Sequence, residues 1–451
     1  MKKLFYYVLG FGLLSSAFFS CKDDTEDPVK PDPEPTTDTT KKDPTPVVVT
    51  PTKYKFSAKL SSDVQSLEGF TVTLSKDTAL TLTSDAEGKV SATLFAGKYD
   101  VTATGKFTDN GKIFTLSGQL TDVEITENFD ETKVFEIALE KTQKSQIVIK
   151  ELYNGGCQKE DGKTFQNDKY VIVYNNSAEK AELKNFGLAI AAPSNSYASN
   201  KNIDGGKLVY ADQGFIPAIY GIWYISEIAF EPYEQKVIVI NGAIDNTATV
   251  PNSVNLANAA YYACYDKEDY KGIVTPSAEI PETQYFKAVK CGLESMTAWP
   301  MSVSSPAFYC FTLSEDPEVY GTTESNLYYE SGQPERHASD ECVKIPVESI
   351  IDGIEVFSAD EKYAAKNQKR LTDNIDKGSV LLTNYKGHTL YRNVDKEATE
   401  ALTENSEKLV YAADEKIDAE ASIKNGAHII YTDTDDSSAD FYERETSSLK
   451  N

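Results

Sequence analysis

The sequence predicts an all-β protein built from two β-sandwiches. Tyr and Phe number 27 and 20, and together with many Thr, Gly, Asn and Asp residues they form a composition typical of strands and turns. Residues 54–139 alternate between apolar and polar side chains, which indicates short strands with one buried face. Residues 147–149, 169–177 and 183–190 are instead apolar on both faces, as expected for the centre of a covered sheet.

The first 20 residues have the pattern of a bacterial lipoprotein signal peptide. Two lysines precede the apolar residues 4–14, and the small residue Ser20 stands before Cys21. Cleavage of such a signal leaves the cysteine as an acylated N-terminus, so we expect lipid on Cys21 to hold the protein on a membrane. No later run approaches the roughly 18–20 apolar residues of a transmembrane helix. An ordinary signal peptide followed by a chance cysteine is the alternative.

Residues 21–52 predict an extended acidic tether rich in Pro and Thr. Such a segment buries too little apolar surface to offset the entropy lost on ordering. Its first residues after the cysteine, Lys22, Asp23 and Asp24, resemble the export signal that moves Bacteroidetes lipoproteins to the outer leaflet, where they face the medium. A solvated charge run in a linker is the alternative.

Charge and cysteine content narrow the classes of function. The chain has 45 Lys and Arg against 70 Asp and Glu, a net charge of −25. Because nucleic-acid affinity comes mainly from neutralising phosphates, we expect no nucleic-acid partner.

A secreted setting allows disulfides to form, and we expect two among four clustered cysteines, with three pairings open. These cysteines are Cys264, Cys291, Cys310 and Cys342. Cys157 is then a buried free thiol.

Residues 53–142 predict a sandwich of about seven strands separated by turns such as Asp109-Asn110-Gly111. The stretches 83–90 and 95–101 resemble the "TDxxGxF…LPAGxYxV" core of carboxypeptidase-regulatory-like domains. The resemblance implies an Ig-like or prealbumin-like sandwich, a fold shared with starch-binding modules, although most copies serve as spacers. Phe95 stands where the family usually has a proline.

Two threonines are candidate modification sites. Asp77-Thr78-Ala79 resembles the acceptor motif of Bacteroidetes protein O-glycosylation, and Asp38-Thr39-Thr40 fits it more loosely. Thr78 lies in an expected turn and Thr39 in the tether, so a transferase could reach both.

Residues 143–451 predict a larger sandwich. The opening "IKELYNGGC…NDKYVIVYNNSAEKAELKNFGLAI" resembles lamin-tail-like β-sandwich domains, and later blocks such as "IIYTDTDDSSADFYER" resemble an uncharacterised Bacteroidetes surface lipoprotein family. The resemblance spans about residues 147–443. It implies one long domain with an insertion at about residues 250–340 that carries the clustered cysteines. Two short helices are also expected, one after the capping-box spacing Ser358-x-x-Glu361 and one at residues 395–402.

No catalytic motif is recognisable. None of the three histidines stands in a G-x-S-x-G or comparable setting, so we expect neither enzymatic activity nor a cofactor. A hydrolase with its site in the insertion is the outside alternative.

One acidic cluster offers oxygen ligands that suit Ca²⁺, although a turn stabilised by its own side chains is the alternative reading. It consists of Asp433, Asp435, Asp436 and Asp440.

Aromatic residues suggest where a ligand would bind. Trp223 and Tyr224, with Tyr261 and Tyr262 close behind, could form a platform for a glycan or a flat chelate, since aromatic faces give large contact area at little entropy cost. Burial of these side chains in the core is the alternative. We expect the binding contacts on loops at one end of the larger sandwich, because rigid strands position variable segments there.

These expectations describe an outer-membrane lipoprotein, lipid-anchored and facing the cell exterior, that binds without catalysis. By analogy of fold and location, its expected role is an accessory to nutrient capture beside a TonB-dependent transporter. An adhesion or scaffold protein that contacts host or neighbouring cells is the alternative. The sequence does not name the ligand.

Overall fold

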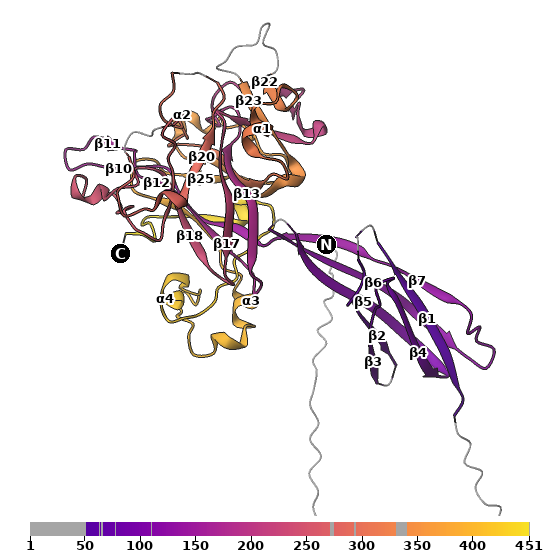
Figure 1. Ribbon diagram of the computed structural model, residues 1–451. Coiled ribbons are helices and arrows are strands. Elements are labelled where there is room, and N and C mark those ends of the chain that lie inside the picture. Colours follow the sequence, from indigo (N-terminus) through magenta and orange to yellow (C-terminus); the bar gives the residue numbers. More distant parts are fainter. Residues whose placement is uncertain are drawn as a thin grey trace, which may run out of the picture. The chain divides into compact units, whose positions relative to one another are not determined.

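The fold is given by a computed structural model (Figure 1) that describes residues 51–62, 64, 66–76, 78–109, 111–270, 275–292, 295–330 and 341–450. The chain divides into the units Met1–Pro51 and Thr52–Asn451, and the second is described below. Cys21, the Lys22, Asp23 and Asp24 stretch, and Thr39 lie outside the described residues. The described elements are mostly strands with a few short helices, which confirms the predicted all-β class.

The first sandwich packs a sheet of three strands against a sheet of five. The smaller sheet has the order β4-β1-β7, where β7 pairs with β1 in parallel. The larger sheet has the order β3-β2-β5-β6-β8. The strands are β1 (Lys53–Ser61), β2 (Thr71–Ser75), β3 (Ala79–Thr83), β4 (Lys89–Phe95), β5 (Gly97–Asp109), β6 (Lys112–Ile125), β7 (Val134–Ala138) and β8 (Glu140–Ser145). These are eight strands within the described residues, where the sequence predicts about seven.

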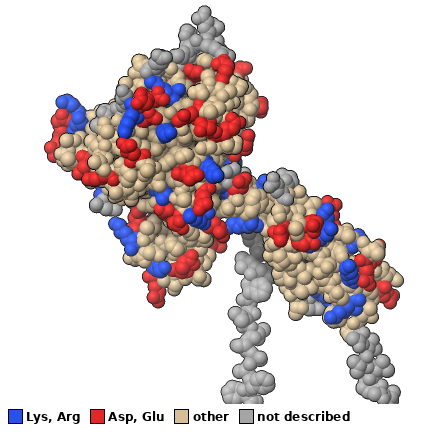
Figure 2. All heavy atoms as spheres, in the orientation of Figure 1, with Lys and Arg blue, Asp and Glu red and all other residues tan. Residues whose placement is uncertain are grey.

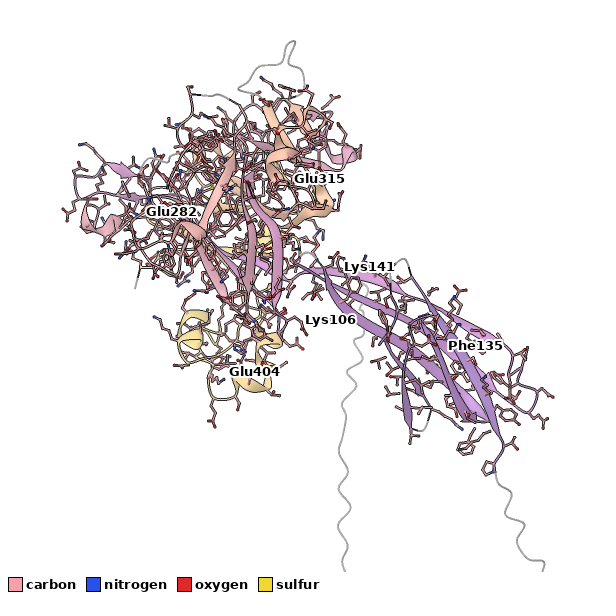
Figure 3. All side chains as sticks on the ribbon, in the orientation of Figure 1. Lys106, Phe135, Lys141, Glu282, Glu315 and Glu404 are labelled. Atoms are coloured by element: carbon pink, nitrogen blue, oxygen red, sulfur yellow. The ribbon has the colours of Figure 1, made fainter. Side chains whose placement is uncertain are left out.

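Period-two alternation explains the core of this sandwich. Along β5, Tyr99, Val101 and Ala103 are buried while the residues between them are exposed, because successive side chains of a strand point to opposite faces. At one edge of the core, Phe135 of β7 (Figure 3) stacks on Phe56 with ring centroids 5.3 Å apart. Both sheets therefore contribute to a single hydrophobic core.

The second sandwich is built from one long sheet of twelve strands, in the order β25-β24-β21-β13-β17-β20-β19-β18-β12-β9-β26-β27. Its two halves contribute to a common core, which includes side chains of β9, β12, β13, β21 and β24. The strands are β9 (Ile147–Tyr153), β12 (Lys169–Asn175), β13 (Ala181–Ile190), β17 (Ile222–Phe230), β18 (Gln235–Asn241), β19 (Tyr262–Cys264), β20 (Tyr285–Val289), β21 (Ala307–Thr312), β24 (Ile350–Ser358), β25 (Val380–Leu382), β26 (Thr389–Arg392) and β27 (Phe441–Arg444). Every residue of β9 and β12 is buried, as their apolar runs predict.

Smaller elements cover this sheet. A three-stranded sheet has the order β16-β23-β22, and the pairs β10-β11 and β14-β15 form short hairpin-like ribbons. These strands are β10 (Cys157–Gln158), β11 (Thr164–Phe165), β14 (Ile203–Asp204), β15 (Lys207–Leu208), β16 (Phe215–Ile219), β22 (Leu327–Tyr329) and β23 (Glu341–Pro346). The helices are α1 (Pro317–Thr322), α2 (Glu361–Ala364), α3 (Lys396–Glu400), α4 (Ala419–Lys424) and α5 (Ser437–Asp440).

The segment expected as an insertion is part of the sheet. Residues 250–340 supply β19, β20 and β21, and β19 pairs in parallel with both β18 and β20, which joins the two halves of the sheet. This segment is therefore not an excursion from the sandwich.

The expected disulfides are absent. Cys264, Cys291 and Cys310 are buried free thiols, and Cys342 is buried in β23, so the two expected bridges are not present among the four. These cysteines pack in core clusters, where a thiol behaves as a small apolar group. Cys157 is a buried free thiol, as predicted.

The two predicted helices exist but are shorter than expected. Asp360, rather than Ser358, caps α2, because its side chain accepts a hydrogen bond from the backbone N–H of Lys362. Asp395 caps α3 by accepting from the N–H of Ala398. Side-chain oxygens at this position satisfy the unpaired N–H groups of the first helical turn.

The surface reflects the acidic composition. Figure 2 shows Asp and Glu side chains spread over both sandwiches on the visible face, with Lys and Arg side chains interspersed. Across the described residues, no helix has the length and apolar character needed to cross a membrane.

Candidate functional site

A pocket of about 800 Å³ opens at one end of the second sandwich. Its lining comes from the start of β12 and the end of β18, from the segment before β21, and from segments that follow β13, β24 and β25. Because β12 is antiparallel to β18, and β21 is antiparallel to both β13 and β24, these strand ends meet at the same edge of the sheet. The lining belongs to segments 166–169, 195–197, 298–304, 359–363 and 383–385, together with Asn241.

Tyrosines form part of the pocket wall. The rings of Tyr197 and Tyr363 stack with centroids 3.8 Å apart and planes inclined by 9°. The Tyr197 hydroxyl lies 3.1 Å from Ser304 Oγ. Tyr385 adds a third ring, with a left-handed backbone (φ 58°) and an N–H that donates to the Gly155 carbonyl at 2.9 Å. All three tyrosines are half-buried, so each keeps part of its surface available for contact.

Amide and hydroxyl groups hold the opposite loop in place. Asn195 Oδ1 accepts from Ser302 Oγ at 2.5 Å and from Ser304 Oγ at 3.2 Å. Asn384 Nδ2 donates to the Val303 carbonyl at 3.0 Å. The Nδ2 group of Asn195 makes no hydrogen bond to the described residues. Donors and acceptors therefore line the pocket in fixed positions.

A lysine lies in the inner wall of the pocket. Lys169 begins β12 and is 5% exposed. Its Nζ donates to the Met301 carbonyl at 2.7 Å. Burial lowers the pKa of Lys169 to about 8, and the neighbouring Asp168 carboxylate opposes this shift only in part. The amine is therefore partly desolvated beside the open pocket.

A buried ion pair ties three of these walls together. Glu355 of β24 and Arg370 have fully buried side chains, and Arg370 Nη2 lies 2.5 Å from Glu355 Oε1. Arg370 Nη1 also donates to the carbonyls of Pro193 at 3.1 Å and Ser305 at 2.8 Å. These carbonyls flank the Asn195 and Ser302 loops, while Arg370 itself follows the 359–363 segment.

The aromatic residues singled out from the sequence do not form a surface platform. Trp223 is 2% exposed and Tyr224 is 5% exposed, so both are core residues. Trp223 packs against Trp299 of the pocket wall, with ring centroids 6.4 Å apart, and does not itself line the pocket. Tyr261 and Tyr262 are half-buried against two different core clusters, and neither lines the pocket.

Sequence reasoning missed the residues that do line the pocket. Tyr197 and Tyr385 stand in "NSYAS" and "TNYKG", polar loop segments that follow β13 and β25. Asn and Tyr together in loops after buried strands are a signal that could have indicated them.

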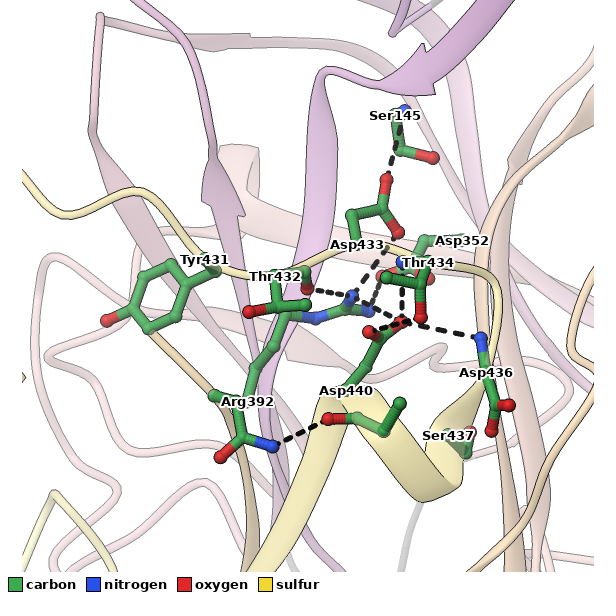
Figure 4. Close-up of polar contacts among 12 residues, drawn as sticks. Ser145, Asp352, Arg392, Tyr431, Thr432, Asp433, Thr434, Asp436, Ser437 and Asp440 are labelled. Atoms are coloured by element: carbon green, nitrogen blue, oxygen red, sulfur yellow. Dashed lines mark hydrogen bonds and ion pairs between the residues drawn. The ribbon is translucent and has the colours of Figure 1, made fainter. Parts of the chain in front are cut away.

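The acidic cluster considered for Ca²⁺ is engaged with protein partners (Figure 4). The buried Arg392 guanidinium lies 3.3 Å from Asp433 and 3.5 Å from Asp440, and 2.5 Å from Asp352. Asp440 accepts from the Thr434 N–H at 2.9 Å, and Asp436 caps α5 by accepting from the Ser438 N–H at 3.0 Å.

This geometry supports the turn interpretation and contradicts the calcium one. Asp435 has a left-handed backbone (φ 54°) within the turn. Within the described ranges, no cluster of three or more His, Cys, Asp or Glu residues is arranged to hold a metal ion.

The histidines that the structure describes have local partners. His388 Nδ1 lies 2.9 Å from Glu443, and His428 stacks on Tyr233 with its Nδ1 3.6 Å from Glu404. Neither histidine lines the pocket. Thr78 is exposed, whereas Asp77 of its motif lies outside the described residues.

Comparison with known proteins gives a partial match to a family model and a shared fold. Residues 231–448 match a family described as "Protein of unknown function (DUF4876)". A crystal structure of a DUF4876 family protein from Bacteroides thetaiotaomicron VPI-5482 has 18% sequence identity and a TM-score of 0.51, covering 86% of this chain and 94% of that chain. At this identity the likeness shows a shared fold.

Two further solved structures match part of the chain. They are DUF3823 family proteins from Parabacteroides merdae ATCC 43184 and Bacteroides ovatus ATCC 8483, with 14% and 11% identity and TM-scores of 0.15 and 0.14. They cover 42% and 41% of this chain, and 82% and 98% of their own chains. No curated protein matches the chain.

Proposed function

We propose that the protein is an outer-membrane lipoprotein that faces the cell exterior and binds a polar small molecule, with a saccharide as the best-fitting class. The pocket at the end of the second sandwich carries this proposal, because it combines tyrosine rings with amide and hydroxyl groups. Ligand sites are typically concave, with aromatic surface and a few fixed polar groups. We further propose that it acts beside a TonB-dependent transporter and that it binds its ligand without catalysing a reaction.

Sugar chemistry matches the walls of the pocket. A pyranose ring has apolar C–H faces that stack on aromatic rings, and its hydroxyls need donors and acceptors in fixed directions. The stacked Tyr197 and Tyr363 offer ring surface, while Asn195 offers an amide N–H₂ not used by the described residues. A flat chelate, the other ligand considered from the sequence, would use the rings but leave the amides without partners.

Binding without turnover is part of the proposal. His388 and His428 lie outside the pocket, and its lining offers two lysines and one aspartate as charged groups. Asp360 is exposed and its carboxylate accepts from the Lys362 N–H, so it caps α2. Glycoside hydrolysis uses a pair of carboxyl groups, whereas the pocket lining offers the single carboxylate of Asp360.

The membrane anchor comes from the sequence. Residues 1–20 have the lipoprotein signal pattern, Cys21 is the proposed acylation site, and residues 21–52 would carry the sandwiches away from the membrane. We also propose that residues 147–443 form a lamin-tail-like domain and that the chain is one of a group of Bacteroidetes surface lipoproteins, as the resemblance implies. Cys21→Ala should release the protein to the soluble fraction. Retention of this variant on membranes without detergent would contradict the anchor. Neutral replacements at Lys22, Asp23 and Asp24 test the export signal, and they should make the protein inaccessible to protease added to intact cells.

The ligand proposal is tested with the full chain carrying Cys21→Ala. A saccharide panel is screened by the shift in melting temperature (Tm), since a ligand that binds only the folded state stabilises it by RT ln(1 + [L]/Kd). Tyr363→Ala should reduce the shift, whereas Tyr265→Ala should preserve it. Tyr265 is a matched control because it is half-buried and packs on Tyr285 outside the pocket. A panel without any shift would contradict the proposal.

A further inference from the structure

Lys169 is a buried cation without a carboxylate partner among the described residues. Its Nζ has one hydrogen-bond acceptor, the Met301 carbonyl at 2.7 Å, although an ammonium group has three N–H donors. Buried charges in folded proteins are normally paired, because transfer of an isolated ion from water is strongly unfavourable. Two of the three N–H donors of Lys169 are therefore available to a ligand in the pocket.

The carboxylates closest to Lys169 in sequence and in the pocket are engaged elsewhere. Asp168 precedes Lys169 in the chain, and its Oδ2 accepts from Ser253 Oγ at 2.7 Å and from the Tyr153 hydroxyl at 3.1 Å. Asp168 precedes β12 and is not among the residues that line the pocket. Asp360, the acidic residue of the lining, is exposed and caps α2.

The pocket carries a local charge opposite to that of the whole chain. Its lining holds Lys169 and Lys362 against Asp360, two positive charges against one negative, which leaves one net positive charge. The whole chain has a net charge of −25. A ligand with a single negative charge would neutralise the lining, whereas a phosphate dianion would leave an excess negative charge.

We propose that Lys169 is the anion-binding residue of this pocket and that the ligand is a saccharide bearing a carboxylate, such as a uronic or sialic acid. This inference rests on the proposed function and specifies its substrate class. The carboxylate would accept hydrogen bonds from the Lys169 ammonium, while the sugar ring contacts Tyr197 and Tyr363 and its hydroxyls reach Asn195.

Burial supports the same assignment through the protonation of Lys169. The pKa of the lysine is lowered to about 8 because the amine is desolvated, and a bound carboxylate would raise it again. The Asp168 carboxylate opposes this lowering of the pKa, and Asp360 and Lys362 are the other charged residues of the pocket lining. Acid-sugar affinity should therefore be constant near pH 7 and fall as pH rises above about 8, where the free protein loses the Lys169 proton.

The test compares acidic sugars with their neutral methyl esters. The full chain carrying Cys21→Ala is titrated calorimetrically with D-glucuronate, D-galacturonate and N-acetylneuraminate, and with the methyl ester of each. We expect at least one acid to bind about tenfold more tightly than its ester, a difference of about 1.4 kcal/mol. Lys169→Met should abolish this preference, because it should weaken the binding of the acid much more than that of the ester.

A matched control separates loss of the anion site from general damage. Lys112 is 6% exposed and its Nζ donates to the Glu348 carbonyl at 2.6 Å, so it resembles Lys169 but lies outside the pocket lining. Lys112→Met should keep the preference for the acid. The Tm of Lys169→Met without ligand should not fall, since replacing an unpaired buried charge by an apolar side chain removes a desolvation penalty.

Four outcomes would count against the inference. Equal binding of acid and ester, or equal weakening of both by Lys169→Met, would overturn the role of Lys169 and leave saccharide binding intact. A preference for the acid that survives Lys169→Met would place the anion site elsewhere. If neither these acids and esters nor the neutral panel bind, the proposed function itself fails.

Discussion

The buried pair of Glu355 and Arg370 allows a quantitative prediction about stability. Glu355 accepts four hydrogen bonds: two from the Arg370 side chain, at 2.5 and 2.9 Å, and two from the backbone N–H groups of Arg370 and Leu371, at 2.7 and 2.9 Å. Glu355→Met removes all four acceptor contacts. The Arg370 guanidinium would then remain buried without a counter-ion.

The expected loss follows from that contact set. Removing one partner of a buried ion pair destabilises a protein by about 3–5 kcal/mol. In a domain of this size, 1 kcal/mol corresponds to roughly 2 °C in Tm, so Glu355→Met should lower the Tm of the second sandwich by about 6–10 °C. Glu355→Met with Arg370→Met should recover part of the loss, because no charge is then left unpaired.

Calorimetry or circular dichroism melts would measure these shifts. Glu124→Gln is the matched control, since Glu124 pairs with Lys98 at 3.2 Å on the surface, where both side chains are more than half exposed. Exposed pairs contribute little to stability, so the control should keep the wild-type Tm. A Glu355→Met variant that melts with the wild type, or a double variant less stable than the single one, would refute the reasoning.

Three further predictions concern the core. Burial raises the pKa of Asp376 to about 6, so the folded state holds this proton more tightly than the unfolded chain. As the pH rises from about 4 to 6, the free energy of unfolding of the wild type should therefore fall by up to about 3 kcal/mol relative to Asp376→Asn, measured by urea melts. Parallel pH profiles of the two proteins would contradict this. Trp223→Ala should lose about 3–5 kcal/mol because a buried Trp leaves a cavity, and an unchanged Tm would show that Trp223 is exposed after all. Cys157, Cys264, Cys291 and Cys310 should resist alkylation in the native protein yet react in denaturant without reductant, and fewer than four labels by mass spectrometry would show oxidised thiols.

Local sequence patterns predict much of the fold. The alternation in residues 54–139 predicts the first sandwich, and the apolar run 169–177 predicts β12 because a fully buried strand requires apolar side chains on both faces. The join through β19 and β20 could not be predicted in this way. These strands have three and five residues and pair in parallel, so their position depends on long-range packing instead of a local period.

The errors at cysteine and tryptophan have a common physical origin. A secreted setting permits disulfides, but Cys310 stands in β21, where all six residues are buried, and there the thiol fills space. Trp223 likewise fills the core behind Trp299. Both residue types serve in cores and in sites, and the sequence alone does not distinguish these roles. The pocket was missed because its walls come from loops far apart in the chain.

The bonds that hold these loops also determine how well they can bind. Loops that become ordered only on binding lose affinity through the entropy of ordering. Here Arg370 fixes the backbone at Pro193 and Ser305, and Asn384 fixes Val303, so the walls are ordered by internal hydrogen bonds before a ligand arrives. Any variant that loosens Arg370 should therefore weaken ligand binding more than its distance from the pocket suggests. Glu355→Met, measured below its own Tm, should show reduced affinity for whichever acidic sugar the titrations identify.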